Sequence, residues 1–395
     1  MSNYALDSQE KSVIVQSLLE KKKDLSYENF MPKINNTFPS FAKSTVRVSP
    51  SVTPSGSIFG ASLDFKIPNN GRLLRLAIKS TISITTDNDQ SGTSDSYFGT
   101  KMYSIADLRQ KGRNISHSDR RHNIAMIQNS DSEQRSALLN TTAISAFPST
   151  ATASYTVYTP LDFWFNQDLS TSLDTYVVRD LELHCEIDTA ANIFVNSGLS
   201  AMVFGSVELI CFFGQLDPFY NNELTKLLFK EQQLNVLAYD SFNEIPETLT
   251  YASGATLDFT IRPRVKQLIS ASSFEAWNQT TGVSLAISRI QLAASGQSLV
   301  DVYSGEQILA NLNKNQGSSD STNNLTHYYS DSKSGEYFSG ALNYDEVYAP
   351  VWTVTVDTSS GASSTNVIAI YLNHNITSML SIDGDSGDIL TISQN

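Results

Sequence analysis

Cysteine is scarce in this chain of 395 residues, which contains only Cys185 and Cys211. Two cysteines exclude a disulfide framework, and each lies in an alternating apolar run, where we expect a small buried core residue. No apolar run approaches the ~18 residues of a membrane-spanning helix. The first residues, MSNYALDSQEK, have neither the basic nor the apolar region of a secretory signal, so we expect none.

Charge is also scarce, and basic residues are the rarer kind. Charged residues make up 17% of the chain, and 27 Lys and Arg face 40 Asp and Glu, which gives a net charge of -13. Phosphate binding needs clusters of Lys and Arg, and the longest basic run is Lys21–Lys23. We therefore expect no direct, sequence-specific binding of nucleic acid.

Catalytic signatures are missing. The sequence has no GxSxG, HExxH, P-loop or CxxC motif, and Ser330 and Lys333 match SxxK only within a polar, low-complexity loop. No histidine has metal-ligand spacing to another His or Cys. His117 and His122 lie beside two arginines, where we expect a solvated loop. We predict no enzymatic activity, no catalytic residue and no cofactor.

One acidic cluster near the C-terminus is a candidate metal site. In DGDSGD, Asp383, Asp385 and Asp388 offer the carboxylate ligands that Ca²⁺ prefers. A polar hairpin tip has the same composition, and that interpretation is favoured.

The chain does contain β-strand periodicity, and the pattern occurs twice. In GASLDFKI (60–67), Leu63 and Phe65 alternate with polar residues, as in a half-buried strand. GATLDFTI (254–261), with Leu257 and Phe259, repeats six of the eight positions at a displacement of 194 residues. Self-similarity at this distance indicates a duplicated unit. We expect these four side chains to pack in the cores of two sibling domains.

A second pattern follows in the same order in both halves. A Leu is followed by a Gly and then by an aliphatic residue, as Leu108, Gly112 and Ile115 and again as Leu292, Gly296 and Leu299. The glycine suits a tight turn between antiparallel strands. Many short alternating runs, separated by Ser, Thr, Asn, Asp and Gly clusters, favour antiparallel sandwiches.

We therefore predict an all-β fold of two tandem eight-stranded jelly rolls. The predicted division is an N-terminal helix and extended arm (1–45), a first jelly roll (46–215), a linker with a short helix (216–249) and a second jelly roll (250–395).

The N-terminal helix is predicted over Asp7–Lys23. Its apolar stripe and its basic end consist of Ile14, Val15, Leu18, Leu19, Lys21, Lys22 and Lys23. Such a helix binds an anionic membrane surface, or packs on its own domain or on a neighbouring subunit; both interpretations stay open.

The run LDFWFN (161–166) places Phe163, Trp164 and Phe165 in sequence. On a strand, the two Phe side chains lie on one face and Trp164 on the other. We expect barrel packing here, with Asn166 and Asp168 shaping the turn; a sugar-stacking site is the alternative.

The whole pattern resembles the double jelly-roll major capsid proteins of tailless icosahedral viruses, the lineage of tectivirus-type phages and adenovirus hexon. Three stretches carry the resemblance after the N-terminal helix and arm: LDFKIPNNGRLLRLAI (63–78), the Leu108–Gly112–Ile115 hairpin, and TPLDFWFNQDLSTSLDTYVVRDLELHCEID (159–188).

The resemblance implies a non-enzymatic shell protein. It implies a homotrimer that mimics a hexagon, contacts with neighbouring trimers, penton or minor capsid proteins and an internal lipid membrane. It also implies location in the virion, and in the host cytoplasm during assembly. The acidic balance fits a shell that does not lie directly on its genome.

Two other interpretations stay open. A carbohydrate-binding jelly-roll module, such as a lectin, a viral spike or a minor capsid protein, needs an exposed aromatic platform, for which Trp164 or Trp277 is the candidate. A cupin-type enzyme needs a His/Glu metal set on one strand pair, and the sequence shows none.

Overall fold

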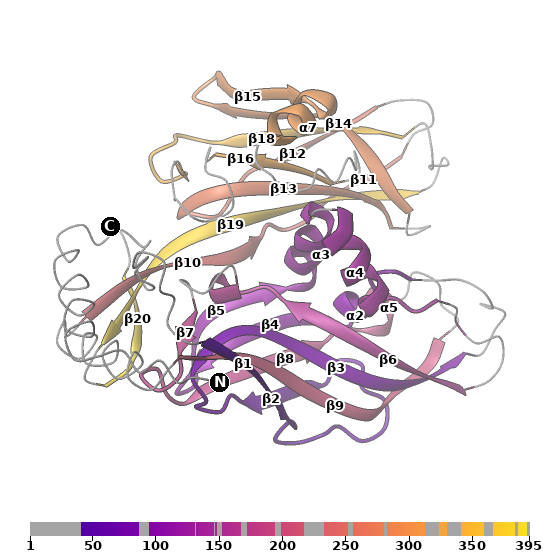
Figure 1. Ribbon diagram of the computed structural model, residues 1–395. Coiled ribbons are helices and arrows are strands. Elements are labelled where there is room, and N and C mark those ends of the chain that lie inside the picture. Colours follow the sequence, from indigo (N-terminus) through magenta and orange to yellow (C-terminus); the bar gives the residue numbers. More distant parts are fainter. Residues whose placement is uncertain are drawn as a thin grey trace.

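The structure is a computed structural model that describes residues 41–86, 95–130, 132–145, 147, 152–166, 172–193, 199–216, 233–251, 256–279, 283–312, 324–329, 341–358, 366–383 and 386–392. Two β-rich halves lie one above the other, with helices α3 (Arg120–Asn129) and α4 (Ser132–Thr142) between them (Figure 1). The predicted N-terminal helix, with Ile14, Val15, Leu18, Leu19 and Lys21–Lys23, lies outside the described residues, and so does the predicted linker helix up to residue 232.

The first half forms two antiparallel sheets that face each other. Its strands are β1 (Phe41–Val48), β2 (Ser62–Lys66), β3 (Arg72–Thr86), β4 (Tyr103–Gln110), β5 (Arg113–Asp119), β6 (Thr152–Leu161), β7 (Leu173–Asp174), β8 (Leu181–Ile187) and β9 (Leu199–Leu216). One sheet has the order β1-β9-β3-β6, with the short β7 also on β3, and the other has the order β2-β8-β4-β5. This interleaved order is that of an eight-stranded jelly roll, here called the first barrel.

The second half repeats this arrangement, and we call it the second barrel. Its strands are β10 (Gln233–Asn243), β11 (Glu247–Thr250), β12 (Leu257–Ile261), β13 (Leu268–Asn278), β14 (Val283–Ala294), β15 (Gln297–Tyr303), β16 (Asn324–Tyr328), β17 (Leu342–Asn343), β18 (Val351–Asp357), β19 (Val367–Asp383) and β20 (Ile389–Ile392). β10 and β11 pair with β19, β19 with β13, and β13 with β16; the facing sheet has the order β12-β18-β14-β15. The predicted all-β, double jelly-roll fold is confirmed.

The sequence repeat marks equivalent strands. The two LDF stretches form β2 and β12, which pair with β8 and β18. The Leu–Gly–aliphatic pattern forms the β4–β5 and β14–β15 hairpins. At their tips, Lys111 and Gly112 have φ values of 50° and 77°, and Ser295 and Gly296 have φ values of 50° and 76°. Two successive left-handed residues are the signature of a two-residue hairpin turn, so backbone conformation is duplicated with sequence.

The helices lie in loops that the sequence pattern did not resolve. They are α2 (Phe98–Lys101), α5 (Ala190–Ile193), α7 (Ser304–Leu312) and the 3₁₀ turn η3 (Trp164–Asn166), besides α3 and α4. Helices α3 and α4 connect β5 to β6, and α7 occupies the same loop of the second barrel, between β15 and β16. None of these was predicted. Among the described residues, no helix has the length and hydrophobicity needed to cross a bilayer.

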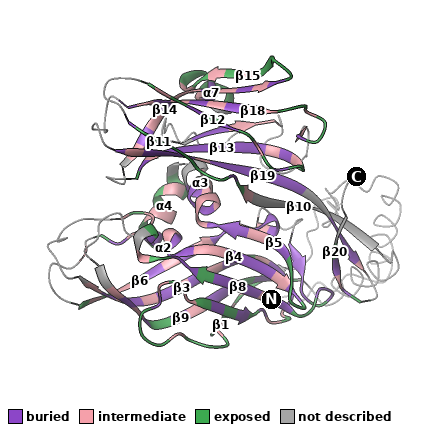
Figure 2. Ribbon diagram, turned by 180° about the vertical axis from the view of Figure 1, so that it is seen from behind, coloured by how far each residue is buried: buried purple, intermediate pink, exposed green. Residues whose placement is uncertain are grey.

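Each barrel encloses its own apolar core, and the strands that line the two cores carry many residues coloured as buried in Figure 2. Leu63 and Phe65 are buried in the first core and Phe259 in the second, while Leu257 is half-buried at its edge. The first core also receives three residues from the end of the second half: Leu380, Ile382 and Ile389. The C-terminal end of the chain therefore returns to the first barrel.

Two predicted boundaries differ from the strands. Residues 41–45 were expected in an extended arm, but β1 pairs with the end of β9 from Phe41 onward. Residues 233–249 were expected in the linker, but β10 and β11 already belong to the second barrel through β19. In both cases cross-strand pairing, which a single strand's sequence does not reveal, decides membership of the sheet.

Candidate functional site at the junction of the two barrels

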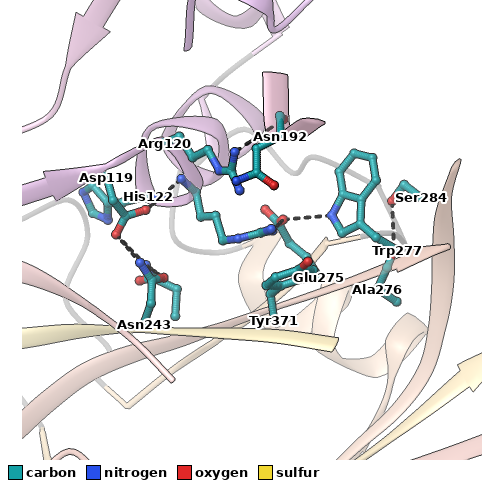
Figure 3. A network of polar contacts seen from close by, with 12 residues as sticks. Asp119, Arg120, His122, Asn192, Asn243, Glu275, Ala276, Trp277, Ser284 and Tyr371 are labelled. Carbon is teal, nitrogen blue, oxygen red and sulfur yellow. Dashed lines mark hydrogen bonds and ion pairs between the residues drawn. The ribbon is translucent and has the colours of Figure 1, made fainter. Parts of the chain in front are cut away.

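Helix α3 fixes one barrel to the other. Asp119 begins the helix, because its Oδ1 accepts hydrogen bonds from the backbone N–H groups of Arg121 and His122 at 2.7 and 3.0 Å. Two residues after the cap, Arg121 reaches across the junction to Glu275 of β13 and Tyr371 of β19. Figure 3 shows Asp119 on one side of this junction and Glu275 and Tyr371 on the other.

Arg121 makes a buried ionic contact between the barrels. Its guanidinium lies 3.0 Å from Glu275 Oε2 and stacks with its central carbon 3.1 Å from the centre of the Tyr371 ring. Trp277 Nε1 donates to the same Glu275 oxygen at 3.1 Å. Burial lowers the pKa of Arg121, and Glu275 opposes this change. The guanidinium still carries its charge at neutral pH, so the contact is an ion pair largely shielded from water, with 16% of the Arg121 side chain and 7% of the Glu275 side chain exposed.

The capping carboxylate also crosses the junction. Asp119 Oδ2 accepts a hydrogen bond from Asn243 Nδ2 at 2.6 Å, and Asn373 Nδ2 donates to Asn243 Oδ1 at 2.7 Å. One oxygen of Asp119 therefore orders the first barrel's helix, and the other binds strands β10 and β19 of the second barrel.

A second contact between the two halves forms where residues 387–389 reach the β4–β5 turn; we call it the Gln110 clasp, or C-terminal clasp. Gln110 Nε2 donates to the carbonyl oxygen of Gly387, and Gln110 Oε1 accepts from the backbone N–H of Ile389, each at 2.8 Å. Lys111 Nζ lies 2.6 Å from Asp388 Oδ1. The amide of Gln110 thus completes two backbone hydrogen bonds of a segment far away in sequence, which holds residues 387–389 in one position.

No family model matches this chain, and no curated protein matches it. Solved structures do. The chain is similar to the capsid of the virus PBCV-1, with a TM-score of 0.69, 14% identity, and coverage of 93% of this chain and 100% of that chain. It is similar to the Faustovirus major capsid protein, with a TM-score of 0.63, 9% identity, and coverage of 93% and 97%.

The crystal structure of the mavirus major capsid protein is similar too, with a TM-score of 0.56, 9% identity, and coverage of 92% of this chain and 93% of that chain. The chain has the double jelly-roll fold. The similarity covers at least 92% of this chain and therefore extends over both barrels.

Within this double jelly roll, the aromatic run of LDFWFN does not form the expected strand. β6 ends at Leu161, and residues 164–166 form the 3₁₀ turn, closed by the Asn166 N–H bonded to the Phe163 carbonyl at 2.9 Å. Phe163 and Phe165 stack at 5.6 Å, and Trp164 packs edge-on against Phe165 at 5.5 Å. All three lie in the first core, so the expectation that Trp164 points to the opposite face of a strand was wrong.

The two tryptophans suggested for sugar stacking are not exposed platforms. Trp164 is 3% exposed. Trp277 is half-buried, and its indole N–H is bound to Glu275 at the junction. A stacking platform needs an open ring face; Trp164 is buried, and the half-buried Trp277 lies at the junction between the barrels.

The described aspartates of the acidic C-terminal cluster bind different partners. Asp385 lies outside the described residues. Asp383 Oδ2 accepts from Ser386 Oγ at 2.8 Å, whereas Asp388 pairs with Lys111 of the first barrel. The described part of the chain contains no group of three or more His, Cys, Asp or Glu side chains able to hold a metal ion.

The loop histidines are not solvated, contrary to expectation. His117 lies on β5 with Nδ1 2.7 Å from Asp107 Oδ1, and His122 lies in α3 with Nε2 3.0 Å from Asp162 Oδ2. His117 meets Asp107 because the two residues are paired across β4 and β5, and His122 lies in the first turn of α3, where the missed signal is the cap residue Asp119.

A serine, a histidine and a glutamate meet inside the second barrel. Ser272 Oγ lies 2.9 Å from His374 Nδ1, and His374 Nε2 lies 3.6 Å from Glu244 Oε1. Burial lowers the pKa of His374 to about 3, so the imidazole is neutral at pH 7 and its contact with Glu244 is not an ion pair there. Ser272 and His374 are fully buried, so the arrangement presents no nucleophile to a substrate.

Proposed function

We propose that this chain is a major capsid protein, a non-enzymatic building block that forms pseudo-hexagonal trimers and tiles an icosahedral shell. The duplicated barrel is the observation that supports this most directly. Two equivalent barrels in one chain supply six in a trimer, and six equivalent units tile a surface as hexagons. The similar solved structures are described as virus capsids or major capsid proteins, which supports the same role.

The junction suits this role, because a tile must keep its shape. Arg121–Glu275 and the Gln110 clasp tie the barrels together at two separate places. The functional division that we propose is a first barrel, a connecting segment and a second barrel, preceded by an N-terminal arm. The protein would then reside in the virion, after assembly in the host cytoplasm.

The N-terminal segment is the proposed contact with an internal membrane or with a neighbouring trimer. Its stripe of Ile14, Val15, Leu18 and Leu19 and the cations Lys21–Lys23 support either partner. Flotation with vesicles of 30% anionic lipid, compared with the Lys21–Lys23 triple Gln variant, separates the two. Charge-dependent flotation supports the membrane, and its absence with an intact trimer supports the neighbour.

The oligomeric state tests the proposed function. We expect size-exclusion chromatography with light scattering to give three times the chain mass of 43.4 kDa at micromolar concentration. A stable monomer would contradict the proposal, because obligate shell interfaces are extensive, on the order of 2,000 Å² or more.

A further inference from the structure

The helix that joins the two barrels has a structural counterpart in the second barrel. In the first barrel, the helix after β5 is α3, and it packs on the sheet of β13 and β19. In the second barrel, the helix after β15 is α7, which lies at the end of the molecule far from the first barrel in both views (Figures 1 and 2). Five of the exposed residues of β15 and α7 define what we call the β15–α7 surface: Leu299, Tyr303, Gly305, Glu306 and Leu309.

This surface exposes three large apolar side chains. The exposed fractions are 49% for Leu299, 57% for Tyr303 and 64% for Leu309. β15 is also an edge strand, since it pairs only with β14 among the described strands. An exposed apolar edge invites a partner. Its equivalent β5 is covered by β10 and β20 of the same chain.

The hairpin register identifies the residue that corresponds to Arg121. In the first barrel the last hairpin pair is Ile105 with Asp119, and in the second it is Arg289 with Tyr303. Ile105 and Arg289 stand at the same distance before the repeated leucines, so Tyr303 corresponds to Asp119. Two residues further on, Gly305 corresponds to Arg121. A Cβ atom built on Gly305 meets nothing within 4 Å, whereas Arg121 is half-buried against Glu275 and Tyr371.

The strand register likewise identifies the residue that corresponds to Glu275. β7 pairs with β3 at Leu73, and β17 pairs with β13 at Ile269. After each of these residues the pairing with β9 or β19 shifts by a bulge. Glu275 of β13 lies six residues after Ile269, and Lys79 of β3 lies six residues after Leu73, so Glu275 corresponds to Lys79. Lys79 is half-exposed between two fully buried neighbours, so it faces out of the barrel.

Near these equivalent positions the signs of the charges are reversed. Within the chain, a cation on the helix, Arg121, meets an anion on the sheet, Glu275. The helix position equivalent to Arg121 is Gly305, which carries no charge, but the next residue is Glu306; the sheet carries Lys79 at the position equivalent to Glu275. Glu306 Oε2 accepts the backbone N–H of Tyr303 at 3.0 Å, and within the described residues neither Glu306 nor Lys79 forms an ion pair. Each therefore has a charge to offer to the other.

We propose that the β15–α7 surface binds the outward face of the β1-β9-β3-β6 sheet of a second copy of this chain, with Glu306 paired to Lys79 of that copy. The inference rests on the proposed function and names the contact that would close the trimer. The two surfaces lie at opposite ends of the molecule, so the contact is head-to-tail, and such contacts close into rings when the rotation permits. The chain then uses two versions of one interface, one between the barrels of a single chain and one between two chains. The helix contributes the cation in the first and the anion in the second.

Charge exchange provides the test. Wild type, Lys79→Glu, Glu306→Lys and the double variant are compared by sedimentation velocity over a dilution series. We expect each single reversal to raise the concentration at which trimers dissociate by at least about tenfold, and the double variant to restore most of the loss. Lys266→Glu, an exposed reversal on another loop, is the control and should leave the trimer unchanged.

A steric variant makes the test independent of charge. Gly305→Trp has room in the isolated chain but fills the proposed contact, so it should abolish the trimer while the thermal unfolding midpoint of the monomer stays within a few degrees of that of wild type. Ala137→Trp, on an exposed position of α4, is the matched control. A wild-type trimer that tolerates Lys79→Glu, Glu306→Lys and Gly305→Trp overturns this inference and leaves the proposed function standing. A wild-type monomer overturns the proposed function itself.

Discussion

Lys111 and Ser295 occupy the same position in their two barrels, each with φ of 50° and each followed by a left-handed glycine. Only the turn of Lys111 is bound by the C-terminal segment, through Asp388. Both turns also bond a carbonyl oxygen of their own barrel, through the N–H of Lys111 to Asp180 at 3.3 Å and the N–H of Ser295 to Tyr348 at 3.1 Å. The duplicated unit is therefore the same in conformation and different in what covers it.

The C-terminal clasp should depend on Gly387. A Cβ atom there would lie 2.0 Å from the carbonyl oxygen of Val177, and the φ of 69° is left-handed. Gly387→Ala should therefore detach residues 386–392 and increase their cleavage in limited proteolysis. Gly60→Ala is the control, since Gly60 has a φ of 71° and open space around it; it should cost only about 1–2 kcal/mol of backbone strain. Equal sensitivity of the two variants would argue against the clasp.

The junction should depend on the pairing of Arg121 with Glu275. Arg121→Met leaves a buried carboxylate without its cation, which should lower the free energy of unfolding by about 3–5 kcal/mol. The double variant Arg121→Met/Glu275→Gln removes both charges and keeps an acceptor for Trp277, so it should recover most of this loss. Urea unfolding followed by tryptophan fluorescence measures both. A double variant as unstable as the single one would show that the loss of unfolding free energy does not come from the unpaired charge of Glu275.

Acid should weaken the second barrel through His374. Its pKa is about 3 in the folded chain against an ordinary value of 6.5, so between these pH values the unfolded chain binds a proton that the folded chain does not. The free energy of unfolding must then fall as pH is lowered through this window, by up to about 1.4 kcal/mol per pH unit. His374→Asn should flatten the pH dependence of the unfolding midpoint between pH 6.5 and 4.5. Parallel curves for the two proteins would refute the assignment.

Both cysteines should be unreactive in the folded chain. Burial raises the pKa of Cys211 to about 12 and that of Cys185 well above its ordinary value. Because the thiolate is the reactive form, a thiol reagent should label neither residue in buffer and both in denaturant. Fast labelling of native protein would mean that one of the two sheets opens readily.

Local and repeated features were predictable from the sequence. Alternation at Leu63 and Phe65 specified a strand, because a period of two needs only neighbouring residues. The glycines at 112 and 296 specified hairpin tips, because few other residues accept that backbone conformation. The recurrence of both patterns in the same order specified two barrels.

Features that depend on distant partners were not predictable. Arg121 lies 154 residues from Glu275, and Gln110 lies 277 residues from Gly387, so no window of sequence contains either pair. Helix α3 was missed because its apolar residues form no clear stripe; the cap at Asp119 and packing against the second barrel hold it instead. The run FWF imitates strand alternation, yet the chain turns after Leu161 and buries all three rings on one side.

An electron cryomicroscopy reconstruction of the purified, full-length protein tests most directly whether the two barrels of each chain build a six-sided trimer. We expect a particle of three chains in which six similar barrel densities surround a threefold axis, and in which α7 of each chain touches β3 of the next. A particle of another symmetry, or one whose two halves cannot be superimposed strand on strand, would contradict it.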